Sequence, residues 1–385
     1  MLGAAILGSG AISRTHVSGY LCYAEQCEIR AACDIFPEKA QTLIDEKGLK
    51  NAVPYKEIDD VLERKDIDLV SICLPPNIHA EVSIKAMKAG KHVLCEKPMS
   101  ASLEECDRMI KAAEETGKLL SVVANNRFVT PLRKLKLLID EGIAGKVLHA
   151  TVNSLWWRAA NYYDLWWRGT WKSETGGCVI NHAVHHVDLL LWMLGRPQRV
   201  TSVIANVAHD NSECEDLGIA ILEYPGLLAQ MTASLVAHGQ EQEMVFQAEK
   251  AKLSAPWNLV SSKPLPNGFP DNDEETLKAI QARYDSLPAL THEAHAGQIG
   301  NVLAAIEGKE DLVVTAQDGR SALELIMAMY KSGVERKTVS LPLEPGDPFY
   351  AQETMLAAVP RFHEKKRSID NFASTEITTG RDYSK

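Results

Sequence analysis

Three short segments of this chain carry residue types that can seat a nucleotide or move a proton. The first is the glycine turn Gly8-Ser9-Gly10, which directly follows an apolar run. The second places Lys97 just after the apolar run 92–95. The third, residues 176–188, holds three histidines, one asparagine and one aspartate. Together they predict chemistry on a hydroxyl group beside a bound dinucleotide.

The glycine turn has the sequence context of a dinucleotide-binding site. Gly8 and Gly10 let the turn close and let the backbone approach a pyrophosphate, and the N-terminus of the following helix favours the anion. Ser13 stands where a third glycine or alanine is usual, which weakens the fingerprint, and an ordinary tight turn is the alternative interpretation. The predicted cofactor contacts in this turn are Gly8, Gly10, Ala11 and Ile12.

A carboxylate after the second predicted strand favours NAD over NADP. Asp34 lies 21 residues beyond Ser13, where a carboxylate accepts the ribose hydroxyls of NAD and repels a 2′-phosphate. Ile35 follows it, so no arginine stands immediately behind it to bind that phosphate. A loop carboxylate near a helix start is the alternative interpretation. NAD is therefore the expected cofactor, with NADP less favoured.

Lys97 is expected at the edge of the sheet where ligands bind. In open parallel sheets, ligands lie beyond the carboxyl ends of the strands, and Lys97 follows one such strand. Its ammonium group could hydrogen-bond a substrate oxygen and help to move a proton. A surface lysine before a structural proline is the alternative interpretation of this motif alone.

The histidine-rich segment supplies a candidate base. On a continuous helix, expected over 179–194, Asn181, His185 and Asp188 share one face. A histidine is suited to take an alcohol proton near neutral pH. Asn181 can orient a substrate but cannot act as an acid or a base. Merely packed histidines are the alternative interpretation.

A zinc site is the competing hypothesis for the same segment. His182 and His186 are four residues apart, and they form a stripe next to the first face. Ala183 stands where the motif His-Glu-x-x-His needs its glutamate, so the general base of that motif is missing. No metal is predicted.

Aromatic residues are concentrated just before the histidines. Five of the seven tryptophans fall between positions 156 and 171, with tyrosines and arginines interleaved. Aromatic rings and charged donors suit a sugar, although they also build cores and subunit contacts. Arg158, Arg168 and Lys172 either bind a carboxylate or phosphate or pair with acidic side chains. The predicted substrate contacts here are Trp157, Arg158, Trp167, Arg168 and His182.

The elements that must position these residues fall into two parts. Over 1–124, strands and helices alternate, with helices expected at 37–47 and 103–116 among others, so a doubly wound parallel sheet is predicted. After 125, consecutive strands with tight turns predict a mostly antiparallel sheet. Residues 256–275 are expected to form a long loop, and helices are expected at 293–307 and 317–332. The expected domains are 1–124 for the dinucleotide and 125–345 for substrate and oligomerisation, followed by a tail at 346–385 that packs on the surface or on a neighbouring subunit.

Bulk properties limit the partners. A chain of 385 residues favours two domains. The net charge of −10 argues against nucleic acid and anionic membranes. No apolar run approaches the roughly 20 residues that span a bilayer, and the first residues lack the features of a signal peptide. The eight cysteines form no Cys-x-x-Cys pair and are expected as buried apolar groups in a reducing compartment, the cytoplasm.

These residues resemble the Gfo/Idh/MocA family of oxidoreductases, which includes glucose–fructose oxidoreductase and inositol dehydrogenases. The resemblance rests on GSGAIS at 8–13, LPPNIHAEVSIKAMKAGKHVLCEKP at 74–98 and GGCVINHAVHHVD at 176–188, and it extends to about residue 345. It implies that Lys97 and His185 are catalytic. Asn181 stands where an aspartate is common in the family. The resemblance further implies cofactor contacts at Leu74, Pro75, Asn77, His79 and Glu96, and substrate contacts at Asn126 and Arg127.

The resemblance also implies a fold and an assembly. The second domain is expected to be an open, largely antiparallel sheet used for oligomerisation, in a homodimer or homotetramer. The leading hypothesis is an NAD-dependent dehydrogenase of a sugar, glycoside or cyclitol hydroxyl, with His185 as base, Lys97 polarising the oxygen and Asn181 positioning the substrate. One alternative is a glycosidase in which NAD transiently oxidises the sugar before elimination. Another is a non-catalytic NAD sensor, which would need neither Lys97 nor His185.

Overall fold

The computed structural model describes residues 1–370, 372 and 383. The chain divides into two compact units. Unit 1 comprises Met1–Phe128 and Thr291–Leu323, and unit 2 comprises Val129–Leu290 and Glu324–Lys385. The boundaries expected at residues 124 and 345 stay predictions. In the described part of the chain, no helix combines the length and the apolar character needed to cross a membrane.

Unit 1 is built on a six-stranded sheet in the order β3-β2-β1-β4-β5-β6. All of its strand pairs are parallel, and most strand residues are buried, as in a sheet covered on both faces. This confirms the predicted doubly wound sheet. The strands are β1 (Leu2–Leu7), β2 (Cys27–Cys33), β3 (Val53–Tyr55), β4 (Leu69–Ile72), β5 (His92–Cys95) and β6 (Leu120–Val122).

The helices of unit 1 begin where local sequence signals place them. Pro37 occupies the first turn of its helix, where its missing N–H costs nothing. Ser102 caps another helix by accepting the Glu105 N–H at 3.3 Å. The helices are α1 (Ser13–Leu21), α2 (Pro37–Lys47), α3 (Ile58–Leu62), α4 (His79–Lys88), α5 (Leu103–Thr116) and α11 (Ala294–Ile306), with short 3₁₀ turns η1 (Pro76–Ile78) and η2 (Asn125–Phe128).

The segment that returns to unit 1 completes its core. Ile299, Val302 and Leu303 of α11 are buried in the same apolar cluster as residues of α1 and β1. Gly19 of α1 allows this approach, because a Cβ there would lie 2.6 Å from Cδ1 of Ile299. Helix α12 (Ala316–Glu335) begins in unit 1 and continues in unit 2.

Unit 2 is built on a nine-stranded sheet in the order β14-β13-β12-β11-β7-β10-β9-β8-β15. Its pairs are antiparallel except for β7 and β10, which run parallel. The prediction of a mostly antiparallel sheet is confirmed. The strands are β7 (Val147–Leu155), β8 (Arg199–Ala205), β9 (Leu217–Tyr224), β10 (Leu227–Ser234), β11 (Gln242–Ala248), β12 (Ala251–Ala255), β13 (Val260–Pro264), β14 (Pro270–Asn272) and β15 (Val339–Ser340).

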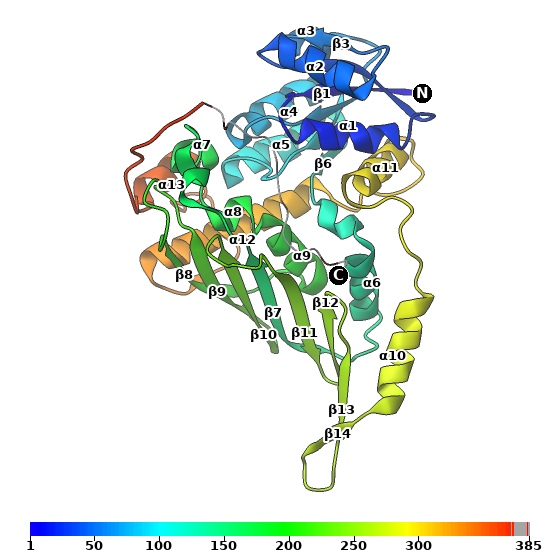
Figure 1. Cartoon of the computed structure of the whole chain (residues 1–385), viewed down its shortest axis with the longest axis vertical. Helices are drawn as coiled ribbons and strands as arrows, with labels where there is room; N and C mark the ends of the chain where they lie inside the picture. Colours follow the sequence, from blue (N-terminus) through cyan, green and yellow to red (C-terminus); the bar gives the residue numbers. More distant parts are fainter. Residues whose placement is uncertain (371, 373–382, 384–385) are drawn as a thin grey trace. The chain divides into compact units, whose positions relative to one another are not determined.

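One face of this sheet is covered by helices of its own unit (Figure 1). The Ser202 N–H of β8 donates to Ser332 Oγ of α12 at 2.8 Å, and α8 and α9 contact the central strands. Burial alternates along β8 and β9, as expected for a sheet with one packed face. The helices of unit 2 are α6 (Thr130–Asp140), α7 (Trp171–Glu174), α8 (Cys178–Asn181), α9 (Val184–Leu194), α10 (Glu274–Ser286) and α13 (Gln352–Ala358), with the 3₁₀ turn η3 (Ala160–Asp164).

The expectation of a long loop over 256–275 was wrong. Strands β13 and β14 form a hairpin that extends away from the other strands of the sheet (Figure 1). Its glycine-, proline- and asparagine-rich sequence is typical of a hairpin turn as well as of a loop, because both need the same backbone conformations. Helix α10 follows, and its first residues are capped by Asp273, which accepts the Thr276 N–H at 3.1 Å.

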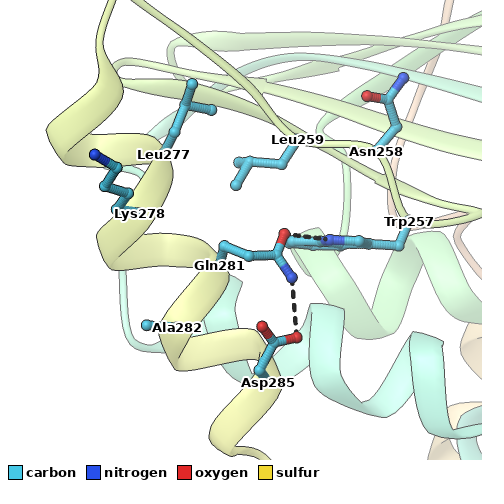
Figure 2. Close-up of a pocket in the computed structure, with 8 residues that line it drawn as sticks. All are labelled: Trp257, Asn258, Leu259, Leu277, Lys278, Gln281, Ala282 and Asp285. Atoms are coloured by element: carbon cyan, nitrogen blue, oxygen red, sulfur yellow. Dashed lines mark hydrogen bonds between the residues drawn. The ribbon is translucent and has the colours of Figure 1, made fainter.

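A hollow of about 620 Å³ lies between α10 and the segment that follows β12 (Figure 2). Polar side chains in its wall are hydrogen-bonded to one another. The Trp257 indole N–H donates to Gln281 at 3.0 Å, and Gln281 donates to Asp285 at 2.9 Å. Trp257 also stacks on Tyr284, with ring centroids 3.8 Å apart. None of the predicted cofactor or substrate contacts lines this hollow.

The described part of the C-terminal tail packs on the surface of its own unit. Ile369 forms an isolated bridge with Leu165, and the backbone N–H groups of Lys366 and Arg367 donate to Asn211 Oδ1 at 2.7 and 2.9 Å. The rest of the tail expected at 346–385, apart from residues 372 and 383, lies outside the described residues.

Candidate functional site

The strand order of unit 1 creates a position where a ligand can bind. The chain proceeds from β1 to β2 on one side, and it later places β4 on the other side of β1. Connections on opposite sides of the sheet leave a crevice at the carboxyl ends of the two central strands. Gly8 follows β1 and Leu74 follows the end of β4, so both motifs meet at this edge.

Gly8 is required by the geometry of the turn. Its φ of +96° is disfavoured for residues with a side chain, and a Cβ would lie 2.4 Å from the Cys73 carbonyl oxygen. A Cβ on Gly10, by contrast, would meet nothing within 4 Å, and Gly10 and Ala11 are exposed. Ser13, in the place of the usual third glycine, donates its hydroxyl to the Gly10 carbonyl at 2.6 Å. The turn therefore packs tightly against the protein at Gly8 and leaves open space beside Gly10, as binding of a pyrophosphate requires.

Asp34 contacts this turn directly. Its Oδ2 accepts the Ser9 N–H at 2.9 Å, and its Oδ1 accepts the Phe36 N–H at 3.0 Å. The carboxylate at the end of β2 is therefore fixed beside the glycine turn. Ile12 is half-buried at the start of α1.

Lys97 is half-buried after β5, and Glu96 before it is buried. The Lys97 N–H donates to Glu96 Oε2 at 3.2 Å. His16 Nε2 lies 2.8 Å from Glu96 Oε1, and His295 Nε2 lies 3.5 Å from the same oxygen. Burial opposes ionisation of Glu96, but hydrogen bonds and charge from the two imidazoles outweigh it and hold its pKa well below the usual range.

This network continues into the core of unit 1. His16 Nδ1 lies 3.2 Å from the Ser71 hydroxyl, which lies 2.8 Å from the Tyr20 hydroxyl. If Ser71 donates to Nδ1, the other ring nitrogen carries the proton and donates to Glu96. The ligand-type atoms of His16, Glu96 and His295 lie within 4.8 Å of one another, a set that zinc accepts. The direct 2.8 Å contact between imidazole and carboxylate favours a hydrogen-bonded network.

His79 joins the segments that follow β4 and β5. Its ring nitrogens lie 2.8 Å from the Leu74 carbonyl and 2.9 Å from the Pro98 carbonyl. The side chain is fully buried, and burial lowers its pKa. Pro75 and Asn77, predicted with it as cofactor contacts, are exposed in the same segment.

Asn126 and Arg127 lie in the 3₁₀ turn η2 of unit 1. Arg127 is only 3% exposed. Its guanidinium donates to the Val313 carbonyl at 3.0 Å and to Asp318 at 3.1 Å. These bonds tie η2 to the returning segment, and Asn126 beside it is half-buried. Their predicted contacts with a substrate stay predictions.

The helix expected over 179–194 is interrupted. Helix α8 ends at Asn181, and α9 begins at Val184. The N–H groups of His182 and Ala183 both donate to the Cys178 carbonyl, at 3.1 and 3.0 Å, so the chain turns there. The helical spacing of Asn181, His185 and Asp188 therefore does not define one continuous face. Apolar residues continue with helical spacing on both sides of this short turn, so the sequence pattern gives no sign that the helix is interrupted.

The three histidines of this segment differ in how far they are buried. His185 and His182 are half-buried, whereas His186 is only 2% exposed. Burial lowers the pKa of His186 to about 3, so it is neutral near pH 7. Asn181 donates its amide to the Gly176 and Gly177 carbonyls at 2.9 and 3.2 Å. His185 is less buried than His186 and stays the predicted base.

A buried carboxylate that sequence reasoning missed holds the start of this segment. Glu215 accepts the Gly177 N–H at 3.0 Å, the Val179 N–H at 3.0 Å and the Tyr330 hydroxyl at 2.9 Å. A Cβ on Gly177 would lie 1.8 Å from the Glu215 carbonyl oxygen, which explains the glycine in the motif. Nothing in the local sequence of Glu215 marks it, because its partners lie more than 30 residues away along the chain.

The aromatic segment forms a cluster around His182. The rings of Trp156 and Tyr162 each lie 5.9 Å from the His182 ring. The Arg158 guanidinium lies 5.5 Å from the Tyr162 ring centroid, and that of Arg168 lies 4.2 Å from it. Unit 2 thus brings together three of the predicted substrate contacts, Arg158, Arg168 and His182.

Two further predicted contacts border this cluster. Trp167 lies under the Arg168 guanidinium at 4.4 Å. Trp157 is 41% exposed and stacks on His238, with ring centroids 5.4 Å apart. Arg168 is paired with Glu174 at 3.0 Å.

Two family models match successive parts of the chain. Residues 2–124 match the oxidoreductase family with an NAD-binding Rossmann fold, and residues 132–254 match the GFO/IDH/MocA C-terminal domain. The chain belongs to the Gfo/Idh/MocA oxidoreductase family. The family resemblance expected from the sequence motifs is therefore confirmed.

Relatives and solved structures of this family cover most of the chain. It is 25% identical to an inositol 2-dehydrogenase of Rhizobium meliloti (strain 1021), over 87% of the chain and 98% of the relative. It is 24% identical to the D-glucoside 3-dehydrogenase of Escherichia coli (strain K12), over 88% and 97%. A similar solved structure is the WlbA dehydrogenase of Bordetella pertussis in complex with NADH and UDP-GlcNAcA, with 28% identity and a TM-score of 0.77 over 89% and 98% of the two chains.

The Glu215 cluster predicts a pH-dependent stability. Burial raises the pKa of Glu215 from 4.5 to about 7, although its N–H and hydroxyl donors oppose the shift. The folded state therefore holds a proton that the unfolded state releases between pH 4.5 and 7, and the contribution of this proton falls as pH rises through that range. Replacing Glu215 by Gln should destabilise the protein most near pH 5. The free-energy gap to wild type should shrink by about 2 kcal/mol between pH 5 and pH 7.5.

Chemical denaturation at a series of pH values measures this gap. Glu353→Gln, at an exposed carboxylate of α13, is the matched control and should follow wild type throughout. A Glu215→Gln gap that stays constant from pH 5 to pH 7.5 would contradict the assignment.

Proposed function

We propose that this protein is an NAD-dependent dehydrogenase that oxidises a hydroxyl group of a sugar, glycoside or cyclitol. The observation that carries the proposal is the glycine turn at the crevice of unit 1, closed by Gly8 and open at Gly10, in a member of an NAD-binding family. Relatives named inositol and D-glucoside dehydrogenases, and a similar structure in complex with a nucleotide sugar acid, support the choice of substrate class.

The residues of unit 1 fit a bound dinucleotide. The N–H groups at the start of α1 and the exposed backbone of Gly10 would hold the pyrophosphate. Asp34 would accept the ribose hydroxyls. When bound, NAD supplies a hydride acceptor. Lys97, whose backbone is held by Glu96, would then donate a hydrogen bond to the substrate hydroxyl and favour the loss of its proton.

We propose His185 as the base that receives this proton. It is only half-buried, unlike its buried neighbour His186, and an imidazole is suited to this task near neutral pH. Asn181 would position the substrate. Because an asparagine cannot take up a proton, the proton does not pass through position 181.

Replacing either Lys97 or His185 by Ala should lower kcat by about 100- to 10,000-fold, the range expected for losing an acid–base group. The affinity for NAD should change little, because neither side chain is assigned to the pyrophosphate or ribose. NADH formation over a panel of inositols, sugars, uronates and glycosides measures turnover, and calorimetry measures NAD binding. Loss of NAD binding in both variants would contradict this division of roles. Substrate cleavage with no net NADH would favour the glycosidase alternative.

We further propose that NAD is preferred over NADP. The Asp34 carboxylate is fixed beside the glycine turn by two N–H donors, and its charge disfavours a 2′-phosphate. The double replacement Asp34→Asn with Ile35→Arg should raise the NADP-to-NAD ratio of kcat/KM by about tenfold or more, since one repulsive charge is replaced by an attractive one. Asp45→Ala, on the exposed side of α2, should leave the ratio unchanged. An unchanged ratio in the double variant would argue against the role of Asp34.

We also propose that the exposed face of the unit 2 sheet binds a second copy of the chain. Val203, Ile219, Ile221 and Leu228 are each 49–54% exposed. The strand register places Val203 opposite Ile219 and Gln230 opposite Ile221, so these side chains share one face. An exposed apolar surface of this kind is typical of an interface.

Ile221→Asp should dissociate the assembly, because a buried unpaired charge at the interface is costly. Light scattering should then report the 42.4 kDa of one chain in place of a dimer or tetramer. Leu265→Asp, at an exposed apolar residue after β13, is the control and should keep the wild-type mass. A wild-type protein that is already monomeric would rule out the proposal.

We assign the protein to the cytoplasm. All eight of its cysteines are free, and seven of them are buried, which suits a reducing compartment. Cell fractionation with an antibody against the chain tests this, and recovery with exported proteins would contradict it.

A further inference from the structure

The aromatic cluster of unit 2 carries an uncompensated positive charge. Two guanidinium groups, of Arg158 and Arg168, lie over the ring of Tyr162. Glu174 neutralises Arg168 at 3.0 Å. Among the residues that the structure describes, no carboxylate lies within 4.0 Å of the Arg158 guanidinium. This is notable in a protein with a net charge of −10, in which acidic partners are abundant.

Neutral groups hold Arg158 in place. Its Nη1 donates to the Trp157 carbonyl at 2.7 Å and to Gln240 Oε1 at 2.9 Å. Its guanidinium also lies 5.5 Å from the ring centroid of Trp156, and the residue is half-buried. A guanidinium that is partly removed from water and fixed by neutral acceptors is ready to bind an anion with little further loss of side-chain entropy.

The position of Arg158 relates it to the proposed chemistry. The two rings that it covers, Trp156 and Tyr162, both contact His182. His182 directly follows Asn181 and precedes His185 by three residues. An anionic group held by Arg158 would therefore lie next to the segment that carries the proposed base.

We propose that Arg158 binds an anionic group of the substrate, a carboxylate or a phosphate, so that the substrate is an acidic sugar derivative and not a neutral polyol. Planar guanidinium groups bind both anions through paired, charge-assisted hydrogen bonds. The inference rests on the proposed dehydrogenase function for the identity of the site, but anion binding is measurable without turnover.

The test compares matched ligands on the full-length protein in the presence of NAD. Calorimetry measures the binding of D-glucose, D-glucuronate, D-glucose 6-phosphate and UDP-glucuronate. We expect at least one anionic ligand to bind wild type about 10- to 100-fold more tightly than glucose, as charge-assisted hydrogen bonds allow. Glucuronate and glucose 6-phosphate distinguish a carboxylate from a phosphate. In Arg158→Gln, the preference for that anion over glucose should fall to near one.

A second variant keeps Arg158 and neutralises its charge with a neighbouring carboxylate. Gln240→Glu places a carboxylate where the amide oxygen now accepts from Nη1, so Arg158 keeps its packing but gains an internal counter-ion. It should lose the anion preference as Arg158→Gln does. Arg283→Gln removes an arginine from an exposed ion pair with Glu141, and it should keep the wild-type preference.

The outcomes separate this inference from the proposed function. A wild-type protein that binds no anion more tightly than glucose, or variants at Arg158 and Gln240 that keep the preference, would overturn the inference. NADH formation is followed in parallel. Anion binding through Arg158 without NADH from any ligand would support the inference and contradict the dehydrogenase. NADH formed from neutral sugars, at the same rate in wild type and in Arg158→Gln, would support the dehydrogenase and contradict the inference.

Discussion

A carboxylate removed from water must be surrounded by donors, and this constraint organises both candidate reactive segments. In unit 1, Glu96 accepts hydrogen bonds from the His16 imidazole and from the backbone N–H of Lys97. In unit 2, Glu215 collects the N–H groups of Gly177 and Val179 and the Tyr330 hydroxyl. Glu96 therefore fixes the backbone of Lys97 itself, and Glu215 fixes the backbone at the start of the segment that leads to His185. The family resemblance marks Lys97 and His185 as catalytic, and both residues are half-buried.

The glycines of the motifs follow from the same packing. Gly8 lies against the Cys73 carbonyl, and Gly177 lies against the Glu215 carbonyl, so any side chain at either position would displace a neighbouring strand or turn. The motif glycines are thus required by the close approach of the backbone. Gly10 differs, because the space beside it is open and suits a ligand.

Much of the fold could be predicted because its signals are local. The bounds of α2 and α5 follow from Pro37 and Ser102, and buried runs mark the parallel strands. The return of α11 to unit 1 could not be predicted, because apolar periodicity does not say which core a helix joins. The break between α8 and α9 was missed because apolar residues continue across it. Hairpin β13–β14 was missed because turn residues dominate its sequence.

In the candidate site too, residues in local motifs could be predicted, and residues placed by long-range contacts could not. Lys97, His185 and the glycine turn could be named from motifs, whereas Glu215, His16 and His295 could not, because only the folded chain brings them to their partners. The sequence also left open whether Arg158 and Arg168 pair with carboxylates. The structure separates them, with Arg168 bound to Glu174 and Arg158 held by neutral groups.

The most direct test of the central claim is a crystal structure with NAD and an oxidisable substrate bound, in which the distances from Lys97 Nζ and from the His185 ring to the substrate oxygens are measured. We expect both groups to lie within about 3.2 Å of one and the same hydroxyl oxygen. Contacts to different oxygens, or either group remote from the reacting carbon, would contradict the claim.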